Sequence, residues 1–302
     1  MSMGSCFAVM IGQKFSDFKF NCRTNPLGIL YNPVSLHKTI DLALSGDRPD
    51  PSRTTTLQER YVHHDFHSEI WGESKTDLMN NLNERLHNMC NSLMSANWLI
   101  LTYGTAMMHR LEGTPVANCH KRPAREFSHK MATINALKEA SLNSLVNLKK
   151  ANPGIRVILT VSPVRHIKDT LPVNSLSKSK LRILCEELTS HLEFVEYFPS
   201  YEVMVDDLRD YRYYTNDLIH PSPEAEDYIW QLFGKRYFGE TTGKLIDTWG
   251  KLRKNLLHRP FNPESTDHKT FLRHTLNELE QLADKLPVDD EIIRVKTLLS
   301  DA

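Results

Sequence analysis

Two short runs of residues are apolar nearly from end to end, and they constrain the fold more than any other feature. They lie at residues 98–103 and 156–161, and a third candidate strand lies at residues 194–198. Strands covered on both faces have this composition, because neither face meets water. Leucine and methionine recur at helical spacing between them. This alternation predicts an α/β fold, a three-layer α/β/α sandwich with a central parallel sheet.

The pattern changes after about residue 240. No further strand signal follows, and residues 241–302 show leucines on one side of a helical pattern. We therefore expect a main α/β domain over residues 1–240 and a C-terminal helical extension over residues 241–302. A helix is expected to start after Ser222, because Ser is a preferred N-cap and Pro223 suits the first helical position.

The charge balance narrows the class of partner. Lys and Arg total 37, as do Asp and Glu, so no net charge attracts nucleic acid or an anionic membrane surface. No apolar run approaches the roughly 20 residues of a transmembrane helix. We expect a small molecule or a neutral polymer as the partner, with no nucleic acid, membrane or cofactor involved; the oligomeric state is not indicated. The five cysteines form no CxxC pair, which favours a reducing compartment such as the cytoplasm.

The N-terminus places a serine where acyl chemistry can occur. Ser5 is followed by apolar residues at helical spacing, which predicts a turn at the start of a helix. Backbone amides at a helix start lack intrahelical partners and can donate to an oxyanion. The turn alone is also explained if Ser5 is simply an N-cap. Cys6, next to it, is an alternative nucleophile.

Asp217 and His220 form a pair that can supply a base. A spacing of three residues on a turn lets the carboxylate reach the imidazole, fix its tautomer and stabilise its charged form. A serine hydroxyl needs such a base, because its own pKa is far above neutral. The pair follows the last predicted strand, where α/β sheets place catalytic loops.

The residues Gly4-Ser5-Cys6-Phe7-Ala8 resemble the signature that names the GSCFA family, a branch of the SGNH/GDSL-like hydrolases. Other stretches are similar to that family in the same order, namely residues 25–33, 103–106, 116–121, 161–166, 197–202 and 217–222. The resemblance covers roughly residues 1–240. It implies a flavodoxin-like strand order and a serine hydrolase that needs no cofactor. The implied substrate is a small-molecule or carbohydrate ester, with Ser5 as nucleophile, His220 as base and Asp217 as the residue that orients it.

The same resemblance implies an oxyanion hole. Gly28 matches the glycine whose backbone amide is a donor, and the amide of Ser5 would be another. The SGNH pattern then carries Gly-x-Asn, whereas this chain has Gly104-Thr105-Ala106. We expect Asn118 to supply the missing side-chain donor, with Thr105 as the alternative.

The strand that precedes the nucleophile in this fold is expected to be missing or truncated. Only four residues precede Ser5, fewer than the five or six of an ordinary strand. We therefore expect that the chain starts too late. In that case the missing signal peptide carries no information about location.

Four further residues are candidates for substrate contacts. Arg165, His166 and Lys178 follow a predicted strand end, where such contacts cluster in open α/β sheets. His67 is the fourth candidate. For each of them, an ordinary loop or packing role is the alternative interpretation.

Two other functions stay open. Histidine is a common ligand of transition metals, and His63, His64 and His67 lie close together in the sequence, so a metal-dependent hydrolase that uses them is one alternative. Adjacent residues of an extended segment point to opposite faces, so not all of these side chains readily converge. A catalytically inactive ligand-binding module with the same fold is the other alternative. The missing asparagine of the Gly-x-Asn pattern, which is the third block of the SGNH signature, and the absent first strand favour it.

Overall fold

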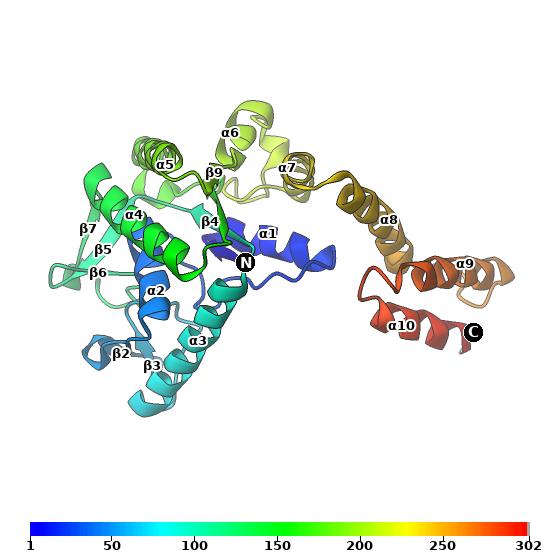
Figure 1. The fold of residues 1–302 in the computed structure, drawn as a ribbon, viewed down its shortest axis with the longest axis horizontal. Helices are drawn as coiled ribbons and strands as arrows, with labels where there is room; N and C mark the ends of the chain where they lie inside the picture. The colour runs from blue at the N-terminus through cyan, green and yellow to red at the C-terminus, as the bar shows by residue number, and fades with distance from the viewer. Residues whose placement is uncertain (301–302) are drawn as a thin grey trace. The chain divides into compact units, whose positions relative to one another are not determined.

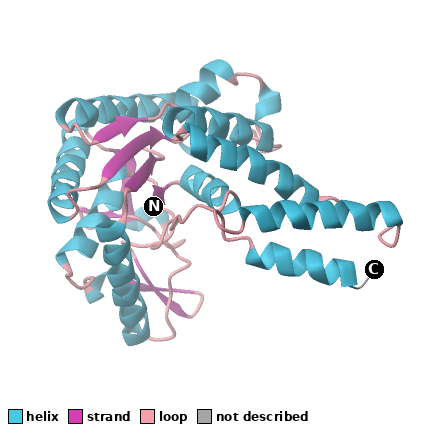
Figure 2. Cartoon of the chain, turned by 45° about the vertical axis from the view of Figure 1, so that its right-hand side comes forward, coloured by secondary structure: helices cyan, strands magenta, loops and turns pink. Residues whose placement is uncertain are grey.

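A parallel sheet forms the centre of the fold in the computed structural model, which describes residues 1–300. Its strands are β1 (Ser2–Gly4), β4 (Trp98–Tyr103), β8 (Arg156–Val161) and β9 (Val195–Tyr197), in that order across the sheet. The strands lie side by side with helices around them (Figure 2). The three strands predicted from apolar runs are β4, β8 and β9, and the predicted α/β class is confirmed.

Figure 1 colours the helices in chain order, from blue at the N-terminus to red at the C-terminus. They are α1 (Cys6–Asp17), α2 (Pro33–Ser45), α3 (Lys75–Ser95), α4 (Ile134–Ala151), α5 (Leu171–His191), α6 (Ser200–Glu202), α7 (Pro223–Tyr237), α8 (Glu240–Leu257), α9 (Thr266–Leu282) and α10 (Asp289–Ser300). The predicted helix after Ser222 is α7, and Ser222 accepts from the amide of Glu226 at 2.9 Å. Within residues 1–300, no helix has the length and apolar character required to cross a bilayer.

The pleat of the sheet divides its residues between two buried faces. The register aligns Ser2, Ile100 and Ile158 in one row and Met3, Leu101 and Leu159 in the next. The second row joins the apolar core that contains the leucines of α2, α3, α4 and α5. On the other face, the Ser2 hydroxyl donates to the Ala8 carbonyl of α1 at 3.0 Å. Helices therefore cover both faces, as a three-layer sandwich requires.

The strand before Ser5, which was expected to be missing or truncated, is present with three residues. It is short, but hydrogen bonds hold it on both edges. On one edge it pairs with β4. On the other edge Ser2 donates to the Arg23 carbonyl and accepts from the Asn25 amide, both at 3.0 Å, and forms a parallel bridge with Thr24. Thr24 thus stands where the flavodoxin-like order has its second strand.

Gly4 ends β1 in a conformation that only glycine adopts readily. Its φ is +135°, and a Cβ atom there would lie 2.1 Å from the Thr102 carbonyl oxygen of β4. The absence of a side chain lets the two backbones approach closely before the chain turns into α1.

Two antiparallel sheets were not predicted. One is the hairpin of β2 (Thr54–Leu57) and β3 (Arg60–His63), and the other has the order β6-β5-β7. The strands of the second of these sheets are β5 (Met107–Leu111), β6 (Thr114–Val116) and β7 (Phe127–Met131). They are short and largely solvent-facing, as the exposed centre of β7 shows. Such strands lack the apolar alternation that marks a half-buried strand in a sequence.

The chain divides into two compact units. The first contains residues 1–13 and 22–230, and the second contains residues 14–21 and the chain from residue 231. The predicted division after residue 240 lies somewhat later, and it assigned residues 14–21 to the main domain. The helices α8, α9 and α10 of the second unit share an apolar core that includes Trp249 and Leu279.

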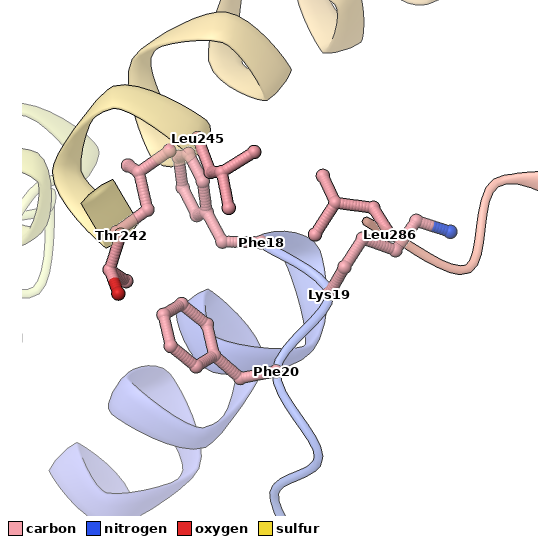
Figure 3. Close-up of a pocket in the computed structure, with 7 residues that line it drawn as sticks. Phe18, Lys19, Phe20, Thr242, Leu245 and Leu286 are labelled. Atoms are coloured by element: carbon pink, nitrogen blue, oxygen red, sulfur yellow. The ribbon is translucent and has the colours of Figure 1, made fainter. Parts of the chain in front are cut away.

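Residues 14–21 are bound within the second unit by polar contacts. The Trp249 indole donates to the Asp17 carbonyl at 2.7 Å, and the Lys19 ammonium pairs with Glu291 at 2.6 Å. A small, mainly apolar pocket lies beside this segment (Figure 3). It is lined by Phe18, Lys19, Phe20, Thr242, Leu245, Ile246 and Leu286.

Replacing Gly4 tests the close approach of β1 to β4. We expect Gly4→Ala to lower the free energy of unfolding by about 3 kcal/mol or more, because it adds backbone strain to a steric clash. Gly46 is a matched control, since its φ is +72° but no atom lies within 4 Å of a Cβ there. Gly46→Ala should cost only about 1–2 kcal/mol of strain. Equal urea midpoints for the two variants would contradict the role of the β1–β4 contact.

Candidate active site

Ser5 lies buried at the junction of β1 and α1. It is 1% exposed, and its hydroxyl has no hydrogen-bond partner among the described residues. Its carbonyl accepts from the Ala8 amide at 2.8 Å, which begins the helix. The amides of Cys6 and Phe7 belong to the first turn, where no intrahelical acceptor exists. A buried hydroxyl without a partner is uncommon and calls for a functional explanation.

Asp217 and His220 form the predicted pair. The His220 Nδ1–H donates to Asp217 Oδ2 at 2.7 Å, and both side chains are almost half exposed. The Thr215 hydroxyl and the amides of His220 and Ile219 donate to Asp217 Oδ1 at 2.7, 3.0 and 2.8 Å. These donors, that of Thr215 foremost, hold the pKa of Asp217 well below its usual range. An ionised acceptor fixes the proton on Nδ1 and leaves Nε2 as the basic nitrogen.

Ser5 and His166 border the same point beside Gly104. A Cβ atom on Gly104 would lie 3.0 Å from Ser5 Cβ, 3.1 Å from the Tyr31 carbonyl oxygen and 3.3 Å from His166 Nε2. Gly104 directly follows β4, so the point lies at the carboxyl end of the sheet. His166 Nε2 is buried and has no hydrogen-bond partner in the described chain.

The loop that carries His166 is joined to the loop that carries His220. The Arg165 amide donates to the Ile219 carbonyl at 3.2 Å, and its guanidinium donates to the Leu218 carbonyl at 3.3 Å. The charge of His220 acts on His166. Within residues 1–300, no hydrogen bond joins His220 to Ser5. Catalytic hydrogen bonds often form only in the substrate complex, so this gap does not disqualify the pair.

The two backbone donors expected for an oxyanion hole are occupied. The Ser5 amide donates to the Thr102 carbonyl at 3.1 Å, and the Gly28 amide donates to the Asn25 carbonyl at 2.9 Å. The first bond continues the pairing of β1 with β4, and the second closes a turn. Both amides therefore already donate hydrogen bonds within the folded chain.

The two expected side-chain donors are also bonded elsewhere. The Thr105 hydroxyl lies 3.0 Å from the Ser177 hydroxyl. The Asn118 amide donates to Ser68 Oγ at 3.1 Å and accepts from the His120 amide at 2.8 Å. Asn118 thus belongs to a partly buried polar cluster with Ser68 and His120.

Lys178, which was expected to contact a substrate, is buried and bonded to two backbone carbonyls. It is 1% exposed, and its ammonium donates to the carbonyls of Gly104 and Ser162, both at 2.7 Å. Burial lowers the pKa of Lys178 to about 7. The side chain therefore ties together the loops that follow β4 and β8.

The other two expected substrate contacts lie nearer to solvent. Arg165 lies with its guanidinium carbon 4.0 Å from the centre of the Tyr214 ring. His67 is half buried beside the Glu69 carboxylate, with 3.4 Å between Nδ1 and Oε2. No hydrogen bond or ion pair in the described chain joins His67 to Ser5.

The histidines proposed as metal ligands are engaged in the fold. His63 Nε2 donates to the Asp50 carbonyl at 2.9 Å, and its Nδ1 accepts from the Asp65 amide at 3.1 Å. Both ring nitrogens are used, so His63 has no lone pair left for a metal. His64 Nδ1 lies 2.9 Å from the Asn118 carbonyl. Among residues 1–300, no group of three or more suitable side chains has the geometry to hold a metal ion.

Two residues that shape the site were not singled out from the sequence. The Tyr31 carbonyl accepts from the Gly104 and Thr105 amides at 2.8 and 3.1 Å, and its ring packs edge-on against His166. Its hydroxyl lies within hydrogen-bond distance of Cys6 Sγ, at 3.6 Å. Asn174 Oδ1 accepts from the His166 amide at 2.8 Å. Tyr31 lies within the stretch 25–33, but nothing in that stretch indicates its contacts.

Comparisons with protein families cover most of the chain. A model described as the GSCFA family matches residues 1–233, and one described as GSCFA domain protein, C-terminal domain, matches residues 249–301. No curated protein and no solved structure matched the chain. Ser5, His166 and the Asp217–His220 pair all lie within the first match.

The charge of His166 can be measured directly. Burial, with the charge of Lys178 as a smaller contribution, lowers the pKa of His166 to about 4. We expect nuclear magnetic resonance to show a neutral His166 from about pH 8 to about pH 5. In the unfolded chain a histidine takes up its proton near pH 6.5. This residue therefore lowers the free energy of unfolding as the pH falls from about 6.5 to about 4. Protonation of the folded His166 near pH 6.5 would contradict this environment.

Proposed function

We propose that this chain, which belongs to the GSCFA family, is a serine hydrolase that cleaves a carboxylic ester. The acyl group is carried on Ser5. The observation that carries the proposal is the Asp217–His220 pair, with its 2.7 Å hydrogen bond and ionised carboxylate. The pair lies on a loop bonded to the loop that borders Ser5.

The pair can supply each proton transfer of the reaction. His220 Nε2 takes the proton of the Ser5 hydroxyl while Oγ bonds to the ester carbonyl carbon. The imidazolium, stabilised by Asp217, then gives that proton to the departing alcohol. Water repeats the sequence on the acyl-enzyme, which releases the acid and restores Ser5. His220 lies on a half-exposed loop, which leaves it room to approach Ser5 once a substrate is bound.

The surroundings of the pair favour a carbohydrate as the alcohol part of the substrate. Tyr211 is 65% exposed, and the Arg165 guanidinium carbon lies 5.7 Å from its ring centre and 4.0 Å from the ring centre of Tyr214. An exposed aromatic face beside a catalytic loop can stack on a sugar ring. The neutral net charge gives no preference for a polyanion.

A ligand-binding module without catalysis is the second candidate. The occupied amides of Ser5 and Gly28 favour it, because the two backbone donors implied for the oxyanion hole are not free. Such a module would bind an ester and leave it intact.

Labelling with a fluorophosphonate separates the two candidates. We expect the reagent to modify the wild-type protein on Ser5, as located by mass spectrometry of the peptides. Labelling should vanish in Ser5→Ala and in His220→Ala, because the hydroxyl is not nucleophilic without its base. Cys6→Ala and His191→Ala, the latter an exposed histidine of α5, should label normally. A folded wild-type protein that stays unlabelled would favour the binding module.

Substitution of Asp217 tests the orientation of the base. Asp217→Asn should lower kcat for p-nitrophenyl acetate by about 10²–10⁴-fold with little change in KM, because an amide can donate to Nδ1 and reverse the tautomer. Asp210→Asn is a matched control nearby, since an asparagine keeps its cap on the Arg212 amide. Similar kcat values for the two variants would exclude Asp217 from the mechanism.

A further inference from the structure

Two buried polar atoms without partners border one small space. They are Ser5 Oγ and His166 Nε2, and the space is the one that a side chain on Gly104 would fill. A buried polar group that is left unpaired destabilises the folded protein. Two such groups beside the same point indicate that a polar atom from outside the chain completes their hydrogen bonds.

The backbone around this space is fixed from several sides. The Gly104 amide donates to the Tyr31 carbonyl, and the Gly104 carbonyl accepts from the buried Lys178 ammonium. The His166 amide is held by Asn174, and its ring packs against Tyr31. The position of His166 Nε2 relative to Ser5 is therefore set before a substrate binds, as preorganised catalytic donors require.

The charged groups around His166 favour its neutral form. Burial is the largest effect that opposes a positive charge on it, and Lys178 and His220 act in the same direction. Asp169 alone among these groups favours the charge. A neutral imidazole carries one N–H and can donate a hydrogen bond without giving up a proton. It is a weak base, so it does not compete with His220, which has a carboxylate partner.

We propose that His166 is a catalytic residue whose Nε2–H donates to the oxyanion formed when Ser5 attacks an ester carbonyl. This rests on the proposed function of Ser5. As Oγ bonds to the carbonyl carbon, the π electron pair moves to the oxygen, and the Oγ proton goes to His220. No proton moves to or from His166. The amides of Cys6 and Phe7 at the start of α1 are the further donors for the same oxygen.

This assignment fills the place left by the third SGNH block. The Thr105 hydroxyl pairs with Ser177, and the Asn118 side-chain amide donates one of its two N–H groups to Ser68. His166 comes instead from the loop after β8, the strand next to β4 in the sheet. The carboxyl ends of neighbouring parallel strands meet at one edge, which brings this loop to Ser5.

The test compares His166→Ala with His166→Gln, whose side-chain amide keeps a donor. The measured quantities are kcat/KM for p-nitrophenyl acetate and the rate of fluorophosphonate labelling of Ser5, each from about pH 5 to 9. We expect His166→Ala to lose about 10²–10³-fold in both rates. His166→Gln should recover part of the loss. The acid limb of the pH profile should stay in place in both variants, because His220 remains the base.

Each contrary outcome has a distinct meaning. Normal rates in His166→Ala, with Ser5 labelled in the wild type, would overturn the role of His166. An acid limb that disappears in His166→Gln would make His166 the base, which also overturns it. A wild-type protein that never labels would refute the proposed function, and the inference with it. His191→Ala should match the wild type throughout.

A second variant guards against a folding defect in the first. Gly104→Ala places a methyl group 3.0 Å from Ser5 Cβ, 3.1 Å from the Tyr31 carbonyl oxygen and 3.3 Å from His166 Nε2, so these neighbours must shift by a few tenths of an ångström. We expect it to keep the wild-type circular dichroism spectrum and lose labelling of Ser5. Nitrogen-15 spectra of the wild type should show the His166 proton on Nε2. Full labelling of Gly104→Ala, or a proton on Nδ1 alone, would contradict the assignment.

Discussion

The close pairing of β1 with β4 is the constraint on which the rest of the site depends. Because Gly4 has no side chain, its backbone can lie against Thr102, and the next amide, that of Ser5, bonds to the same residue. The chain then has to turn, and α1 begins at once. A three-residue strand thereby fixes the proposed nucleophile at the carboxyl end of the sheet. The hydrogen bonds of Ser2 to the segment 23–25 compensate for the shortness of the strand.

The buried ammonium of Lys178 completes this end of the sheet. Taking a cation out of water is costly, and burial shows its effect in the lowered pKa of Lys178. Two hydrogen bonds of 2.7 Å, to the carbonyls of Gly104 and Ser162, offset part of that cost. Those carbonyls follow adjacent strands, so the side chain fixes the spacing of the two loops that carry Gly104 and His166. An apolar residue would leave both carbonyls unpaired.

Local patterns made the fold and part of the site predictable from the sequence. The apolar runs became β4 and β8, and the Asp217–His220 hydrogen bond forms within one turn, where spacing alone determines which atoms can meet. Asn118 and Lys178 each have a partner that is distant in the sequence: Asn118 bonds to Ser68, 50 residues away, and Lys178 bonds to Gly104, 74 residues away. Sequence spacing carries no information about such contacts. The expectation for β1 was based only on the number of residues that precede Ser5. That number says nothing about the hydrogen bonds that hold both edges of the strand.

The two histidines near Ser5 show how environment separates the roles of one side chain. His220 lies almost half exposed against an ionised carboxylate, which stabilises the imidazolium that a base must become. His166 lies in a buried space within reach of the Lys178 ammonium, which opposes that charge. One ring is therefore suited to move a proton and the other to hold one in place. A mechanism in which the two histidines exchanged roles would place a positive charge on His166, where Lys178 opposes it. It would also make the half-exposed His220 the fixed hydrogen-bond donor. The electrostatics of the site thus favour the division proposed here.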